Sequence, residues 1–262
     1  MKTTSALALS AVAAMCCAAP VQALEEKIDI SLGHTEFSRG AGKRDLQQIE
    51  YMRKDGPNTL VLNASTAQRH YGGSERFAGR AISGALYHRW SKTVTTRTQV
   101  AYSSDDPVFA ARILDQNVTY SGLDSTALTF GVRHARYFGD VDSKAWYASG
   151  AYYMDRLSMR YRYTKHETDG LGDTSSHVVS LHLKDTSGRG NTQLWLSRGD
   201  SIHEYLWTPE LLQGSRQGIS VRRVQPLNFA TSLHATLERA TYETPLRNYH
   251  GISASLGLAY RW

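Results

Sequence analysis

The chain has little of what holds most exported or membrane proteins together. Only two of its 262 residues are cysteines, Cys16 and Cys17, and both lie near its start, so the rest of the chain has no disulfide framework. After residue 23, no stretch approaches the roughly 18 consecutive apolar residues of a transmembrane helix. It also has no internal repeat, low-complexity linker or sign of a second domain. Disulfide-stapled domains and helical membrane proteins are therefore excluded.

The first residues have the three parts of a secretory signal. Lys2 gives a positive start, residues 6–14 form a short apolar run, and Val21-Gln22-Ala23 fits a small-x-small cleavage site. We predict a signal peptide at residues 1–23 and a mature chain at residues 24–262. Losing Lys2 leaves 29 basic against 24 acidic residues, a net charge of +5.

Alternation with a period of two dominates the mature chain, and the last segment shows it best. One face there has Ile252, Ala254, Leu256, Leu258, Tyr260 and Trp262, and the other has Gly251, Ser253, Ser255, Gly257, Ala259 and Arg261. No helical period competes. Strands of a membrane barrel show this pattern, with apolar residues toward lipid and polar or small residues inward.

The arginines of a second alternating segment distinguish a membrane barrel from a soluble sandwich. Leu157, Met159, Tyr161 and Tyr163 alternate with Ser158, Arg160, Arg162 and Thr164. An unpaired guanidinium in a packed core would cost several kcal/mol. A barrel wide enough to hold water accommodates the same face easily.

Turn residues divide the mature chain into about 14 strands, with 12 as the alternative, since bacterial barrels have an even number. The expected strands start near Ile28, Asp45, Thr59, Phe77, Val94, Arg112, Ala127, Lys144, Arg156, His177, Thr192, Gln217, Phe229 and Tyr249. Tight turns alternate with longer connections at residues 103–110, 166–175 and 200–214. We predict an all-β fold: a single closed antiparallel transmembrane β-barrel in the bacterial outer membrane, multi-pass, with both termini periplasmic.

Aromatic residues gather near the expected strand ends, which suits girdles at the two membrane interfaces. They are Trp90, Tyr137, Phe138, Trp146, Trp207, Phe229, Tyr260 and Trp262. The last two also belong to a closing motif of Ser255, Gly257, Tyr260 and Trp262. This motif is similar to the terminal-strand signal that the barrel assembly machinery reads, so that machinery is an expected partner.

Several longer stretches carry a family resemblance over essentially the whole mature chain. They lie at residues 95–98, 106–110, 162–164, 192–199, 207–210, 224–227 and 242–245. In these stretches the sequence closely resembles the YaiO family of outer-membrane proteins. The resemblance implies an outer-membrane barrel and no known reaction. Related barrels occur at the ends of polysaccharide-export proteins, after helical periplasmic repeats. This sequence shows no such repeats.

Tests for catalytic and metal-binding patterns give no site. Asp105 and Asp106 would point to opposite faces, and the spacing from Asp200 to His203 is wrong for a same-face pair. Gly-x-Ser-x-Gly and HExxH are absent. His177 and His182 would face opposite sides of a strand, and residues 167–173 lack the carboxylate spacing of an EF-hand. We predict no enzyme, no metal and no cofactor.

The inward arginines are the remaining functional feature. Arg97, Arg160 and Arg162 are expected to point inward, with Arg133 and Arg222 as companions. Two interpretations stay open: a cationic lumen that concentrates anionic solutes or acidic sugars, and a structural ladder in which the arginines pair with Asp29, Asp115 or Glu238.

The sequence leaves three functional classes to compare. The first is a passage or export barrel for a saccharide or anionic solute. The second is a plugged structural barrel that binds envelope glycans or lipids through external loops. In either case basic residues would also meet outer-membrane lipid and lipopolysaccharide phosphates. An enzyme comes third, and nucleic acid is not an expected partner.

Overall fold

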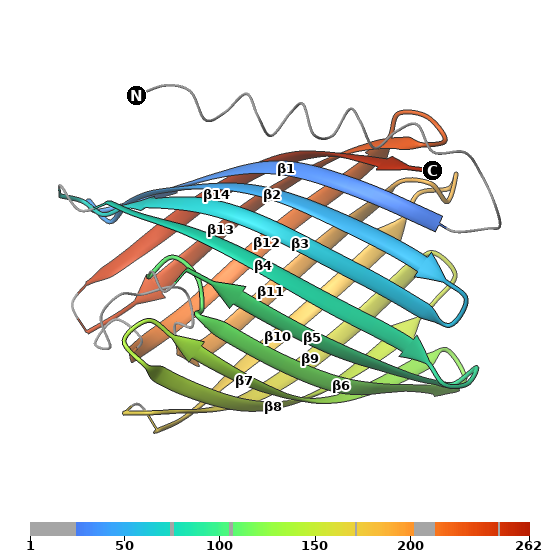
Figure 1. The fold of residues 1–262 in the computed structure, drawn as a ribbon, viewed down its shortest axis with the longest axis horizontal. Coiled ribbons are helices and arrows are strands. Elements are labelled where there is room, and N and C mark those ends of the chain that lie inside the picture. Colours follow the sequence, from blue (N-terminus) through green and yellow to red (C-terminus); the bar gives the residue numbers. More distant parts are fainter. Residues whose placement is uncertain (1–24, 74–75, 105–106, 171, 202–212, 246) are drawn as a thin grey trace.

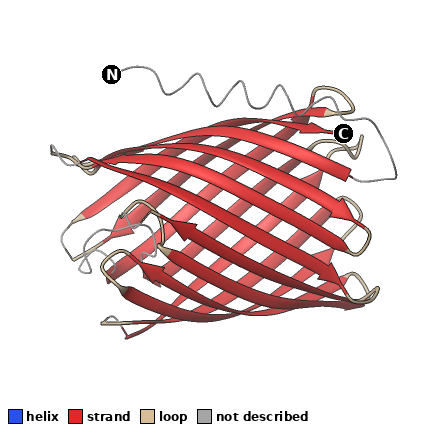
Figure 2. Cartoon of the chain, viewed as in Figure 1, coloured by secondary structure: helices blue, strands red, loops and turns tan. Residues whose placement is uncertain are grey.

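The computed structural model describes residues 25–73, 76–104, 107–170, 172–201, 213–245 and 247–262. The signal peptide predicted at residues 1–23 therefore lies outside the described residues. Within the described chain every regular element is a strand (Figure 2). None of its segments is a helix long and apolar enough to cross a membrane.

Fourteen antiparallel strands close into a single ring, which confirms the predicted barrel and its larger strand count (Figure 1). The strands are β1 (Glu25–Phe37), β2 (Gly42–Asp55), β3 (Asn58–His70), β4 (Arg76–Arg89), β5 (Val94–Ser103), β6 (Arg112–Leu123), β7 (Thr126–Tyr137), β8 (Val141–Tyr153), β9 (Leu157–Thr168), β10 (Gly172–Lys184), β11 (Asn191–Ser201), β12 (Gln213–Pro226), β13 (Thr231–Glu243) and β14 (Asn248–Arg261). Each strand pairs with its neighbours in sequence, and β1 pairs with β14.

The seam between β1 and β14 removes the open edge that an unclosed sheet would present. It runs in continuous register from Lys27 beside Arg261 to Phe37 beside Gly251. Beyond it, Glu26 and Trp262 exchange backbone hydrogen bonds of 3.2 and 3.1 Å. Both ends of the described chain thus lie at one end of the barrel, here called the terminal end, and the opposite end is called the far end (Figure 1).

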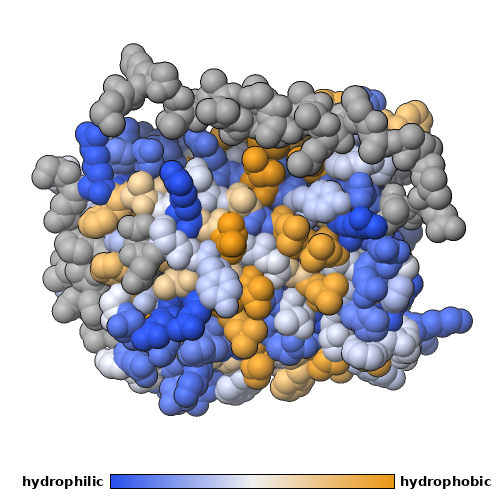
Figure 3. Space-filling view, viewed as in Figure 1, coloured by the Kyte–Doolittle hydropathy of each residue, from blue (hydrophilic) through white to orange (hydrophobic). Residues whose placement is uncertain are grey.

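The two faces of the strands differ as the alternation predicts. Outward side chains such as Leu32, Ile82 and Phe130 keep 61%, 64% and 63% of their surface exposed. Figure 3 shows apolar residues in a belt across the middle of the barrel, with hydrophilic residues toward both ends. An apolar belt between polar rims is the outer surface of a membrane barrel. Met159 and Leu256 are also about half exposed, so they form no shared core.

One expected long connection is wrong. The sequence predicts a long connection at residues 166–175, but β9 continues to Thr168 and β10 begins at Gly172. Glu167 and Asp173 are register partners in this hairpin, and Lys165 pairs with Asp173 at 2.6 Å. Polar residues occupy both faces here, because the strand ends project beyond the apolar belt, so alternation no longer marks the strand.

The other two expected connections also include strand residues. β5 ends at Ser103 and β6 begins at Arg112, so the connection between them is close to the predicted one. β11 extends to Ser201 and β12 begins at Gln213, and residues 202–212, with Trp207, lie outside the described residues. At the terminal end, exposed Trp90 and Phe229 lie in turns, and Tyr260 stacks on Trp262 with ring centroids 5.7 Å apart.

Candidate lumen site

Arginines occupy inward positions on several strands of the barrel. The five predicted lumen residues, Arg97 of β5, Arg133 of β7, Arg160 and Arg162 of β9, and Arg222 of β12, all share a face with buried or small residues. Sequence reasoning missed Arg44, Arg69 and Arg216, which are also inward. The alternation of faces would have identified Arg216 as inward, because it precedes Arg222 by an even number of residues on the same strand.

Asp115 of β6 is the centre of the best-connected part of the inner wall. Its side chain is fully buried, although it carries charge. Arg97 donates to its Oδ1 at 3.0 Å, and Arg133 donates to its Oδ2 at 2.8 Å. The Tyr147 hydroxyl donates to Oδ1 at 2.8 Å and accepts from Asn117 at 2.9 Å. Asp115 is thus stabilised by two cations and a hydroxyl, as a buried carboxylate requires.

A glycine makes room for the tyrosine of this network. A Cβ at Gly131, which is the register partner of Tyr147, would come within 2.2 Å of its ring. The ring therefore lies flat against β7 and reaches Asp115. On its other side, the guanidinium carbon of Arg162 lies 3.7 Å from the ring centroid. Arg162 thus rests on an aromatic face, an arrangement that attracts a cation without neutralising its charge.

The structural ladder describes only part of the interior. Asp115 pairs with Arg97 and Arg133, and Glu238 pairs with Arg216. Asp29 instead contacts His234 at 2.8 Å and Lys27 at 3.2 Å. Among the described residues, no carboxylate pairs with the remaining predicted arginines, Arg160, Arg162 and Arg222.

The interior therefore carries an excess of positive charge. Inward arginines include three without a carboxylate partner in the described chain, whereas the inward carboxylates are already engaged by cations. Two of these arginines are also partly desolvated: Nε of Arg162 and Nε of Arg222 are inaccessible and bond no described group. Low-dielectric walls of one charge sign attract ions of the opposite sign.

The wall formed by β11, β12 and β13 has several small inward residues. A hollow of about 330 Å³ lies there, its floor formed by Ser197, Gly218, Ser220 and Thr236. Trp195, Arg216, Arg222 and Glu238 border it, and we call it the Trp195 hollow. Arg216 lies over Gly218, donating to Ser197 at 3.1 Å and to Glu238. Sequence reasoning did not single out Trp195, although Leu194 and Leu196 beside it are outward and alternation places it inward.

At the far end, apolar groups come into the bore. Val108, on the connection after β5, is almost completely buried against β4. A Cβ at inward Gly79 would be 3.0 Å from both Val108 and Phe109, so this connection folds over the inner wall. Phe109 in turn lies under the guanidinium of Arg44 at 5.8 Å.

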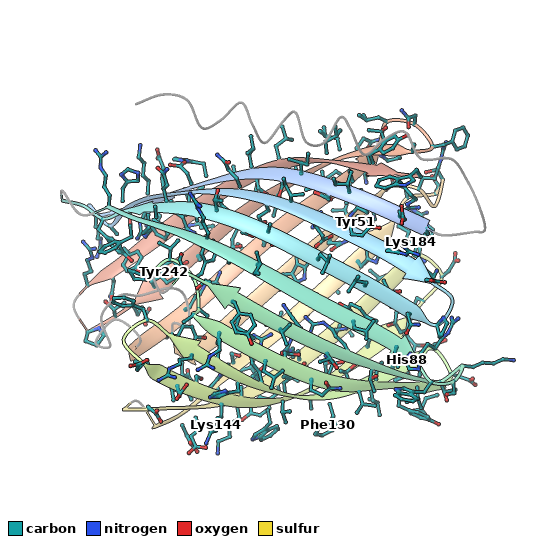
Figure 4. All side chains as sticks on the ribbon, viewed as in Figure 1. Tyr51, His88, Phe130, Lys144, Lys184 and Tyr242 are labelled. Carbon is teal, nitrogen blue, oxygen red and sulfur yellow. The ribbon has the colours of Figure 1, made fainter. Side chains whose placement is uncertain are left out.

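A second apolar cluster joins opposite sides of the ring at the same end. Tyr242 and Tyr249 stack at 4.8 Å between centroids, and Phe37 packs beside them with Arg69 over its ring at 4.0 Å (Figure 4 labels Tyr242). Val141 of β8 also packs against this cluster, although β8 lies across the ring from β1. We call these two groups together the far-end collar.

The other residues tested in the sequence do not assemble into a site. His182 is inward and His177 outward, and no group of three or more His, Cys, Asp or Glu in the described part of the chain could hold a metal ion. Asp105, Asp106 and His203 lie outside the described residues. In the closing motif, Ser255 and Gly257 face inward, and Tyr260 faces outward.

Comparisons with known proteins agree with this architecture. The family model of the YaiO membrane beta barrel domain matches residues 25–206. Among solved structures, the CymD monoaromatic hydrocarbon channel matches with a TM-score of 0.61 at 7% identity, over 91% of this chain and 88% of that one. A bacterial polysaccharide outer membrane secretin matches with a TM-score of 0.50 at 10% identity, over 91% and 98%. An anion-selective porin from Comamonas acidovorans matches with a TM-score of 0.48 at 12% identity, over 92% and 99%. At identities this low, the first two of these matches show a shared barrel fold and nothing about function.

Proposed function

The chain belongs to the YaiO membrane β-barrel family, and we propose that it forms a passage across the bacterial outer membrane for anionic solutes, acidic saccharides included. The passage is the water-filled space inside the ring, and its positively charged wall selects the solute. No covalent chemistry is needed for this function. Inward groups need only attract an anion, exchange it between sites and release it.

One observation carries the proposal: Arg160, Arg162 and Arg222 face the interior with no carboxylate partner in the described chain. A purely structural ladder would pair its cations, as Asp115 does for Arg97 and Arg133. Leaving guanidinium groups unpaired in a confined space raises their self-energy unless water or a mobile anion accompanies them. An anion entering the bore relieves that cost, so anions are favoured over cations of the same size.

The experiment measures reversal potential across planar bilayers under a potassium chloride gradient. The unmodified protein should prefer chloride over potassium, and the preference should fall severalfold in the Arg160→Gln/Arg162→Gln double variant. The matched control is Lys144→Gln/Lys165→Gln, which removes the same charge from outward positions of β8 and β9. Lys144 points away from the barrel (Figure 4), so its neutralisation should leave selectivity unchanged. Well-folded protein that gives no channel steps, or a double variant that behaves like the control, refutes the proposal.

A plugged barrel that binds envelope glycans or lipids is the second candidate, and the far-end collar favours it. Val141 of β8 packs against the cluster of Ala41, Ala240, Tyr242 and Tyr249, which lies across the ring, so apolar contacts occupy part of the bore. This candidate predicts no conductance in the same bilayers, with ligand binding at the outer surface. The channel recordings therefore separate the two functions directly.

For either function we propose that the terminal end is periplasmic and the far end external. Outward cations without a carboxylate partner in the described chain gather near the far ends of their strands: Arg80, Arg112, Lys144, Arg198 and Arg239. Phosphate groups of lipopolysaccharide are suitable partners for such cations. The closing motif at the terminal end would then face the barrel assembly machinery during insertion.

A further inference from the structure

The Trp195 hollow has three properties that together describe a ligand. It offers an aromatic face, an arginine without an acceptor and a floor of small hydroxyl residues, all on one wall of the lumen. We propose that it binds one ring of an acidic sugar, which stacks on Trp195 and places its anionic group on Arg222. This inference rests on the proposed passage and names the solute class that the passage holds.

Trp195 supplies the stacking surface. It lies between Ser180 of β10 and Ser220 of β12, so small side chains flank it on both neighbouring strands. Its ring stacks on no other aromatic residue of the described chain. An aromatic face left open toward water carries a large apolar area that a partner can cover. The C–H face of a pyranose ring has the size and the flat apolar character to cover it.

Arg222 supplies the charge recognition. It is half-buried, its Nε bonds no described group, and its register partners are the uncharged Gln193 and Thr236. An anion at this guanidinium would supply an acceptor that the described chain does not provide. A carboxylate can accept two parallel bonds from one guanidinium, so it fits this donor well.

Arg216 and Glu238 supply polarity without net charge. They are paired with each other, so their charges cancel. Glu238 can still accept a hydrogen bond from a sugar hydroxyl, and Ser197, Ser220 and Thr236 can donate or accept. Hydroxyl groups of this kind distinguish a sugar acid from a simple inorganic anion.

Size and surroundings fit a single ring in a longer chain. The volume of about 330 Å³ lies at the lower limit of small-molecule sites, which suits one monosaccharide unit. The row of register partners continues from Trp195 through Ser180 to Arg160. Strand spacing puts the Arg160 backbone about 10 Å from that of Trp195, a distance at which it can meet the acid group of an adjacent unit.

The test uses glucuronate, with glucose and acetate as probes of the ring alone and the acid alone. Single-channel recordings of the unmodified protein should show transient blockades by glucuronate at concentrations where glucose and acetate give none. Trp195→Ala and Arg222→Gln should each weaken glucuronate block at least tenfold. The matched control is Trp146→Ala, which removes an outward tryptophan from β8 and should leave block unchanged.

Titration calorimetry of glucuronate into detergent-solubilised protein reads binding without any need for conductance. It keeps the inference testable if the barrel does not conduct, and it needs no variant to fold. If the barrel prefers chloride but binds glucuronate no more tightly than glucose or acetate, the proposed sugar site in the Trp195 hollow is refuted. The proposed anion passage is not. The proposed sugar site is also refuted if Trp195→Ala, Arg222→Gln and Trp146→Ala all bind glucuronate equally strongly. If the barrel does not conduct, and Trp195→Ala and Arg222→Gln lose glucuronate binding, the result supports the sugar site and refutes the passage.

Discussion

Replacing Asp115 with asparagine tests how the interior holds its charge. The side chain is fully buried and accepts from Arg97, Arg133 and Tyr147. Asparagine keeps the shape and one carbonyl acceptor but removes the negative charge. Arg97 and Arg133 would then share a wall with no counter-charge at its centre, and Arg162 lies just beyond Tyr147.

The size of the expected loss in stability depends on how exposed the two arginine partners of Asp115 are. Removing one partner of a buried ion pair costs about 3–5 kcal/mol, whereas exposed pairs are worth about 0.2–1 kcal/mol. The side chains of Arg97 and Arg133 are 22% and 37% exposed, so water in the lumen screens part of the loss. We expect Asp115→Asn to lower the free energy of unfolding by about 2–3 kcal/mol.

Urea unfolding of the protein in lipid vesicles, followed by tryptophan fluorescence, measures this loss. The control is Asp140→Asn: Asp140 is 82% exposed and pairs with Arg136 at 2.9 Å in the turn after β7. Its loss should cost at most about 0.5 kcal/mol. The folded Asp115 variant should also prefer anions more strongly than the unmodified protein. Equal stability losses in the two variants would show that the network around Asp115 does not stabilise the barrel.

Two further predictions concern packing and orientation. Gly131→Ala should lower the free energy of unfolding by about 1–3 kcal/mol, because the added methyl group would displace the Tyr147 ring. The control Gly150→Ala, whose Cβ would lie 3.8 Å from its nearest side chain, should change the stability little in the same unfolding assay. Equal losses in the two variants would contradict the close packing. If the far end is external, a membrane-impermeant maleimide should label Asp169→Cys and spare Lys92→Cys in intact cells, and the reverse pattern would invert the orientation.

The overall architecture was predictable because a strand in lipid must show its apolar face outward. The period of two gave the inward positions of Arg97, Arg160 and Arg162 without knowledge of any partner strand. It also predicted where strands begin: β5 and β6 start at the expected Val94 and Arg112. Such information is local, because each residue's face depends only on its parity within its strand.

The partners of the inward charges were not predictable in the same way. His234 meets Asp29 only because the barrel closes and β1 lies beside β14. Arg216 meets Glu238 through the register between β12 and β13, which a single sequence does not specify. The hairpin between β9 and β10 was missed for another reason. Its outward residues, Glu167 and Asp173, are polar where the strands leave the apolar belt, so the pattern resembled a loop.

In the proposed passage, the far-end collar and the inward arginines lie at different depths along the axis of the barrel. Apolar groups such as Val108 and Tyr242 would limit the width at one mouth, and the arginines without a carboxylate partner in the described chain would set the ion preference deeper inside. Because different side chains govern the two properties, size cut-off and ion preference can drift separately as the sequence changes. A barrel with the same ring of strands could thus change the size of its solute without changing the sign of the solute's charge.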